Sequence, residues 1–148
     1  MLAFVFTKPV LADISPTPSI KKEFKVDSAT STAKKEINRE RINEHFEIIK
    51  ESLDTRYQFL LKIKTKVQER LGDNTEAKDK FAEIAKNEEN YLNDLNNFED
   101  KLGEILSAET PGKIIPELRT AVKAARTDLN DIHKILADTI KLLISETE

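Results

Sequence analysis

The sequence contains no cysteine and no tryptophan, and it has one methionine and two histidines among 148 residues. Without cysteine the chain can form neither disulfides nor thiolate metal sites, and it has no cysteine to act as a nucleophile or to carry a lipid anchor. Glycine occurs three times and proline five times, and proline is absent from residues 21–110. A β-sandwich or an α/β fold of this length needs many more turn residues. The composition therefore predicts an all-α protein.

The charge is nearly balanced overall but unevenly distributed. Acidic residues outnumber basic ones by 27 to 24, which gives a net charge of −3. A general nucleic-acid binder carries a basic footprint, so we expect no nucleic-acid partner. Residues 33–71 have more basic than acidic groups, whereas residues 72–107 are strongly acidic. This order suits two antiparallel helices with favourable charges between them, and an anionic partner of the first segment is the alternative.

The first 32 residues differ from the rest of the chain. Residues 1–12 combine an apolar run with small or aliphatic residues, Val10 and Ala12, at the −3 and −1 positions of a cleavage site, as at the end of a secretory signal peptide. The run is shorter than a usual signal and lacks its basic start. Either the sequence begins inside the signal, or these residues are an ordinary apolar N-terminus. Residues 13–32 are rich in Ser, Thr, Pro and Lys, and we expect a flexible, disordered leader.

These features bear on where the protein lies in the cell. A signal peptide at residues 1–12 predicts an exported protein, which is periplasmic, secreted or at the cell surface. Without it, a cytoplasmic protein is expected. No stretch of the sequence approaches the ~18 apolar residues that span a bilayer, so we expect no integral membrane segment in this chain.

The remaining residues show helical periodicity. In the first segment apolar residues recur every three or four positions in a near-heptad seam. Gly72 can end this helix in a left-handed conformation, and the polar residues 73–75 offer an N-cap to the next. Pro116 suits the first turn of the third. The predicted helices span residues 33–71, 75–107 and 116–145.

The two connections between the predicted helices are short, and short connections make consecutive helices antiparallel. Residues 33–148 are therefore expected to form an elongated up-down-up three-helix bundle with coiled-coil-like packing. Because the first helix is the longest, its start is expected to overhang the far end of the bundle.

Several sequence features are shared with a known group of proteins. They are a Ser/Thr/Ala leader with a Lys/Glu/Arg-rich helix start at 28–41, Phe46 shortly after Arg41-Ile42-Asn43, Lys-Val-Gln-Glu-Arg-Leu-Gly at 66–72, and Thr110-Pro111 ahead of 118–126. In these features the chain resembles small, uncharacterised exported three-helix proteins of reduced-genome bacteria from candidate phyla. The resemblance implies an exported three-helix protein. It transfers no functional residue, because the group has no assigned activity. Pro116 departs from the uninterrupted third helix expected for the group.

The motifs of common catalytic and metal sites are missing. The sequence has no glycine-rich phosphate loop, no nucleophile elbow and no calcium-loop spacing. A di-iron site in a helical bundle needs two Glu-x-x-His pairs, but the residues three positions before His45 and His133 are Ile42 and Asn130. We therefore expect no enzymatic activity, no cofactor and no metal site.

One polar residue interrupts the apolar seam of the second helix. The antiparallel register places this residue, Glu88, level with His133 on the third helix and close to Arg56 and Tyr57 on the first. A buried carboxylate needs a donor, so we expect these four residues to form a polar layer across the middle of the bundle. Such a layer fixes register, as a polar seam residue does in coiled coils. A solvated arrangement is one alternative. A ligand or metal role is the other, although one His and one Glu are too few for a closed zinc site.

These features favour a non-enzymatic, exported structural or protein-interaction bundle. Its partner could be another protein or a second copy of the chain, because Ile48, Phe59 and Leu61 are apolar residues beyond those of the seam. A periplasmic holdase-like chaperone with an apolar concave face left open is the alternative. A bundle that opens on a membrane surface is a further one, and it requires strongly apolar, lysine-flanked helix faces.

Overall fold

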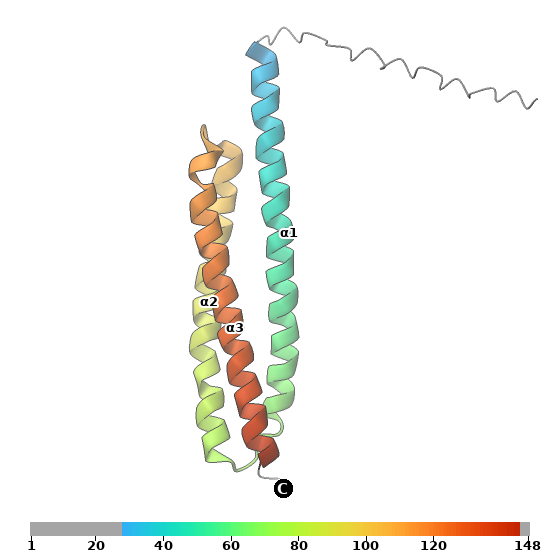
Figure 1. The fold of residues 1–148 in the computed structure, drawn as a ribbon, viewed down its shortest axis with the longest axis vertical. Coiled ribbons are helices and arrows are strands. Elements are labelled where there is room, and N and C mark those ends of the chain that lie inside the picture. Colours follow the sequence, from blue (N-terminus) through green and yellow to red (C-terminus); the bar gives the residue numbers. More distant parts are fainter. Residues whose placement is uncertain (1–27, 146–148) are drawn as a thin grey trace, which may run out of the picture.

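The structure is a computed structural model that describes residues 28–145, so the signal-like segment 1–12 and most of the predicted leader lie outside the described residues. Three long helices account for nearly all of this range, and each runs antiparallel to the one before it in the chain (Figure 1). They are α1 (Ser28–Gln68), α2 (Thr75–Ser107) and α3 (Ile115–Ser145). No described residue lies in a strand, which confirms the predicted all-α bundle. The first turns of α1 extend beyond the ends of the other two helices, as expected (Figure 1).

The predicted bounds of the first helix were wrong at both ends. Residues 28–32, expected as the end of the flexible leader, form the first turns of α1. Ala is the strongest helix former and Ser and Thr are only moderately poor ones, and no proline follows to interrupt them. At the other end α1 stops at Gln68 rather than Leu71. The last turn tightens there, since the amide of Arg70 donates to the carbonyl of Val67 and not to that of Lys66.

The turn between α1 and α2 follows the sequence signals. Gly72 has a φ of 50°, the left-handed conformation expected of it. Asn74 is the N-cap of α2, and its side-chain oxygen accepts a hydrogen bond from the amide of Ala77 at 2.7 Å. The second connection contains a short 3₁₀ turn, Pro111–Lys113, and α3 begins at Ile115, one residue before Pro116.

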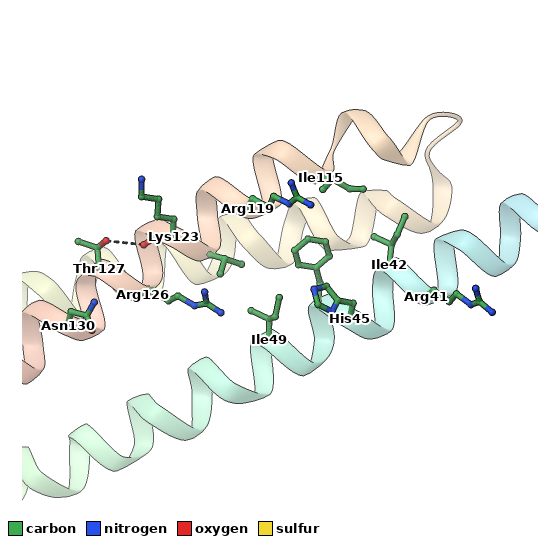
Figure 2. Close-up of a pocket in the computed structure, with 12 residues that line it drawn as sticks. Arg41, Ile42, His45, Ile49, Ile115, Arg119, Lys123, Arg126, Thr127 and Asn130 are labelled. Atoms are coloured by element: carbon green, nitrogen blue, oxygen red, sulfur yellow. Dashed lines mark hydrogen bonds between the residues drawn. The ribbon is translucent and has the colours of Figure 1, made fainter.

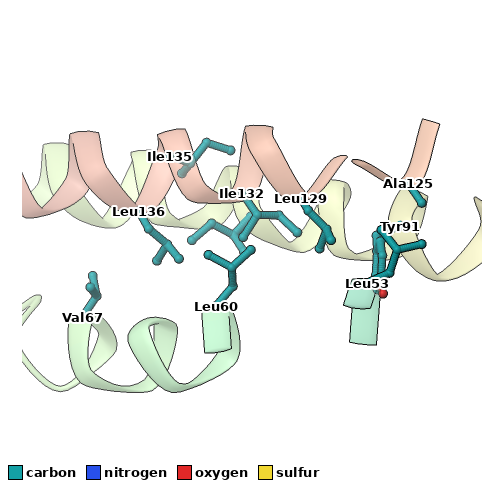
Figure 3. Close-up of a cluster of buried hydrophobic side chains, with 10 residues drawn as sticks. Leu53, Leu60, Val67, Tyr91, Ala125, Leu129, Ile132, Ile135 and Leu136 are labelled. Carbon is teal, nitrogen blue, oxygen red and sulfur yellow. The ribbon is translucent and has the colours of Figure 1, made fainter. Parts of the chain in front are cut away.

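Heptad spacing organises the core. The buried residues of α1 lie seven positions apart, and so do five of those of α2, which is the packing expected of a coiled coil. The α1 set is Phe46, Leu53, Leu60 and Val67, and the α2 set is Ala77, Ile84, Tyr91, Phe98 and Ile105. Figure 3 shows Leu60 and Val67 of α1 facing Ile132 and Leu136 of α3.

The three helices are not packed equally. Helix α3 buries residues on a broad stripe, and most contacts between helices join α2 to α3. Helix α1 buries a single residue per heptad in its described part. Its neighbouring positions, such as Ile42, Ile49 and Ile63, pack against the core but remain partly exposed. The seam between α1 and α3 therefore leaves apolar side chains within reach of solvent, and the candidate site lies along it.

Candidate functional site

The predicted polar layer divides into separate interactions. The carboxylate of Glu88 is largely buried, with its side chain 15% exposed, and its donor is Lys64 of α1 at 2.6 Å. Tyr57 is a neighbour of this pair, because its pKa is raised first by burial and then by the charge of Glu88. The ring of Tyr57 also packs on that of Tyr91, with centroids 4.6 Å apart.

The other two predicted members of the layer lie elsewhere, which corrects the prediction. Arg56 donates a hydrogen bond to Asn130 on α3 at 2.7 Å, and His133 is exposed. The register along the bundle axis was right, but consecutive residues of a helix point about 100° apart. Tyr57 therefore faces α2 while Arg56 faces α3. The donor that sequence reasoning missed, Lys64, lies one turn beyond Leu60, the α1 residue level with Glu88, and its long side chain reaches back.

A pair of carboxylates between α2 and α3 was also missed. Asp128 of α3 is buried among apolar residues. Its pKa is raised to about 6, first by burial and then by a hydrogen bond with Asp94 and by the charges of Asp94 and Asp131. Two carboxylates in contact share one proton more readily than they hold two charges. Among the described residues no group of three or more His, Asp or Glu side chains could hold a metal ion.

A groove with an apolar floor and a basic rim lies between α1 and α3, near the overhanging end of α1. It has a volume of about 650 Å³. Figure 2 shows Arg119 and Arg126 on the α3 side of this groove and His45 on the α1 side. The floor and the remaining rim consist of Ile42, Phe46, Ile49, Ile115, Val122, Arg41, Lys123, Thr127 and Asn130.

A second groove opens between the same two helices near the other end of the bundle. Its volume is about 610 Å³, and its lining is mostly aliphatic. Helix α3 contributes Ile140, Leu143 and Ile144, and two cations, Lys66 of α1 and Arg70 just after its end, lie at the edge of the groove. The α1–α3 seam therefore has two recesses that apolar side chains of a partner could fill.

The surface between the two grooves has the same character. Phe59 lies two heptads after His45 and one heptad before Lys66, so it follows the same stripe of α1, and it is 61% exposed. Ile48 lies one heptad after Arg41 and is 66% exposed. We call this surface the basic face. It comprises the two grooves together with Ile48, Arg56, Phe59, Asn130 and His133.

The basic face carries no acidic residue, although the chain as a whole is acidic. None of the groove-lining residues is Asp or Glu. The ion pairs found among the described residues involve Lys50, Lys64, Lys80, Lys101 and Lys141, none of which belongs to the basic face. Its cations are therefore not neutralised by carboxylates of the described chain. Combined with exposed Ile and Phe, this arrangement attracts a ligand that is both anionic and partly apolar.

The sequence signal for this face was the basic balance of residues 33–71, for which an anionic partner was the alternative interpretation. His45 is exposed at the rim of the first groove, where its ring packs edge to face on that of Phe46, with the ring centroids 5.5 Å apart. None of the described helices has an apolar stretch long enough to cross a membrane. No family model, no curated protein and no solved structure matches the chain.

Proposed function

We propose that the chain is a non-enzymatic protein-interaction bundle whose basic face binds an acidic, partly apolar surface of a protein partner. The observation that carries this proposal is the basic face itself, with two apolar recesses, unpaired cations and no carboxylate along one side of the described bundle. Cations at a rim set orientation and association rate, while side chains that fill recesses supply affinity.

The spacing of the two grooves specifies the form of such a partner. On α1 they are centred near His45 and Lys66, which are about 21 residues or about 32 Å apart along a helix. A partner helix of that length could place apolar side chains in both grooves and carboxylates along their rims. It would add a fourth helix to the bundle, in the helix-in-groove mode of peptide recognition.

A peptide probe tests this proposal. The probe is a synthetic helix of about 25 residues, with Leu at its core-facing heptad positions and Glu beside them, and the comparison peptide has Lys in place of Glu. We expect the acidic probe to bind and the basic one not to bind. The double variant Arg119→Glu/Arg126→Glu should weaken binding at least tenfold, about 1.4 kcal/mol.

The matched control reverses two charges on the exposed surface of α2. Lys78→Glu/Lys86→Glu changes the net charge by the same amount but lies outside both grooves. It should retain most of the affinity for the acidic probe. Equal binding of both peptides, or equal loss in both double variants, would show that the basic face is not a specific docking surface. Isothermal titration calorimetry measures the affinity of each variant for each peptide.

A holdase-like chaperone is the second candidate, and the aliphatic second groove favours it. An unfolded client would bind there through apolar side chains with little dependence on its charge. In that case the chain should suppress aggregation of a chemically unfolded client protein, and Ile140→Ser/Ile144→Ser should abolish the suppression. Arg119→Glu/Arg126→Glu should leave it unchanged, which separates this function from the first.

Export belongs to the proposal as well, on the strength of the signal-like residues 1–12. Fractionation of cells that express the chain from its natural gene tests it. Recovery of the protein from the periplasm, the cell surface or the medium is expected, and exclusive recovery from the cytoplasm would contradict export.

A further inference from the structure

The seam on the other side of α1, between α1 and α2, carries the opposite charge. Lys50 of α1 pairs with Glu99 of α2 at 2.8 Å. The pKa of Lys50 is raised first by its hydrogen bond with Glu99 and further by the charges of Glu47 and Asp54. These three carboxylates therefore lie around a single lysine on the α1–α2 seam. Glu40, one heptad before Glu47, continues the same stripe of α1.

This acidic surface also has exposed apolar residues. Leu92 and Leu106 lie one heptad before and one heptad after Glu99, so they share its stripe of α2. They are 45% and 52% exposed. We call this surface the acidic face. Its members are Glu40, Glu47, Asp54, Leu92, Glu99 and Leu106.

The two faces complement each other in charge and in apolar content. Both follow α1, on opposite sides of its buried stripe. Six of the seven large apolar side chains that are strongly exposed in the described chain lie on one face or the other. Of these, Ile48, Phe59, Ile140 and Ile144 belong to the basic face, and Leu92 and Leu106 to the acidic face.

We infer that the basic face of one copy of this chain binds the acidic face of a second copy. The inference rests on the proposed function, since it uses the same basic face and names its partner. Cations that have no carboxylate partner within the described part of their own chain gain one from the neighbour, and exposed Ile, Leu and Phe side chains leave water together. No other partner is needed to supply the acidic and apolar surface that the basic face requires.

The geometry of the contact has a direct consequence for assembly. The two faces lie on opposite sides of the buried stripe of α1, so one neighbour cannot cover both at once, and the contact is head to tail and not a two-fold dimer. Each copy keeps one unused face of each kind, and assembly continues until a ring closes or the supply of protein ends. Because the charges at this contact are exposed to solvent, a higher salt concentration screens their attraction and weakens the contact.

Sedimentation velocity on the full chain gives the first test. At about 50 mM NaCl, the mass should rise above the monomer value of 16.9 kDa with increasing protein concentration. At about 500 mM NaCl it should return toward the monomer. A chain that stays monomeric at low salt and at about millimolar concentration would overturn the inference. A contact with a dissociation constant above about 1 mM has a binding free energy of no more than about 4 kcal/mol.

Mixing two variants gives the sharper test. Arg119→Glu/Arg126→Glu disables the basic face, and Glu40→Gln/Glu47→Gln disables the acidic face without creating a charge that the first variant could bind. Each variant alone should be monomeric. A mixture should form a 1:1 complex of about twice the monomer mass and stop there, since one functional face of each kind remains and no further copy can add.

Controls separate this contact from its competitors. Lys80→Glu/Lys86→Glu, at positions on neither face, should assemble like the unaltered chain, and helix content by circular dichroism verifies folding of every variant. If the first basic-face variant unfolds, Arg41→Glu/Lys123→Glu replaces it, because both side chains line the same groove.

Three results would overturn the inference. They are assembly of either single-face variant alone, a mixture that remains monomeric, or a monomeric chain that instead floats with vesicles rich in anionic phospholipid. Binding of the acidic peptide by a chain that never self-associates would leave the proposed function standing and reject the second copy as its partner.

Discussion

At the scale of single residues, the Lys64–Glu88 pair gives a direct test of the contacts of the buried carboxylate. One carboxylate oxygen of Glu88 is buried without a hydrogen-bond partner, and the other accepts from Lys64. Lys64→Ala would leave a buried carboxylate with no donor, so it should lower the free energy of unfolding by about 1–3 kcal/mol. Glu88→Leu removes the charge together with the need for a donor, and should leave stability unchanged or higher. Urea denaturation measures both.

His133→Ala is the control for this pair, because the same argument once predicted His133 as the donor. His133 is exposed, and substitution of such a residue should change stability by no more than about 0.5 kcal/mol. A larger loss for His133→Ala than for Lys64→Ala would contradict the geometry described above.

Asp128 makes stability depend on pH. Its pKa is raised to about 6 from an ordinary value of 3.8, so the folded chain binds this proton more tightly than the unfolded chain. Its contribution is therefore present below about pH 4 and is lost as the pH rises through about 6. Asp128→Asn removes the titration and supplies a donor to Asp94. We expect it to raise the free energy of unfolding at pH 7.5 by about 1–2 kcal/mol and to have little effect at pH 4.

Thermal melts at several pH values check this prediction. Asp100→Asn is the matched control, since Asp100 is exposed on α2 and is no cause of the raised pKa of Asp128, and its effect should be small at every pH. A stabilisation by Asp128→Asn that is equally large at pH 4 and pH 7.5 would mean that Asp128 is not the titrating group.

At the scale of elements, two glycines with open surroundings should respond in opposite directions to alanine. A Cβ atom at Gly72 or at Gly103 would meet no heavy atom within 4 Å, so only backbone conformation decides the effect. Gly72 has a left-handed φ of 50°, and Gly72→Ala should cost about 1–2 kcal/mol. Gly103 lies within α2, and Gly103→Ala should stabilise the protein by about 1 kcal/mol. Thermal or urea unfolding of each single variant tests this, and the same sign for both would contradict it.

The turn at Gly72 also shows what sequence signals can determine about an element. The roles of a glycine after the end of one helix and of an Asn before the start of the next depend only on local backbone conformation and hydrogen bonding, so they were predictable. The end of α1 at Gln68 was not, because a tightened last turn differs from an α-helical one only in which carbonyl accepts each bond. Likewise, Ser28–Thr32 have a composition that fits both a leader and a weak first turn.

At the scale of the whole molecule, the fold could be predicted because it depends on the spacing of apolar residues along the chain. The candidate site could not, because it depends on how each helix is rotated about its own axis. Heptad spacing and short connections are enough to specify an antiparallel three-helix bundle. The two charged faces require the rotation of each helix about its axis, which separates Glu47 from Ile48 and Arg56 from Tyr57. A net charge of −3 averages over both faces and conceals each of them.

The overhang of α1 predicts where protease will trim the whole molecule. Residues 31–38 are exposed, whereas Arg39 is partly buried and donates a hydrogen bond to the carbonyl of Ala108 beyond the end of α2. A helical segment without tertiary packing opens more often than one that covers a core. Brief trypsin digestion should therefore cleave after Lys34 or Lys35 and leave a resistant core that begins there.

Arg39 should set that limit, because its side chain holds the overhang to the α2–α3 end of the bundle. In Arg39→Ala, we expect the start of the core to move to Ile42, after cleavage at Arg41. Mass spectrometry of the resistant fragment reads both start points. Early cleavage between Phe46 and Val67, where α1 contributes its buried residues, would instead mean that α1 leaves the bundle as a unit, and the basic face would then not be a stable surface.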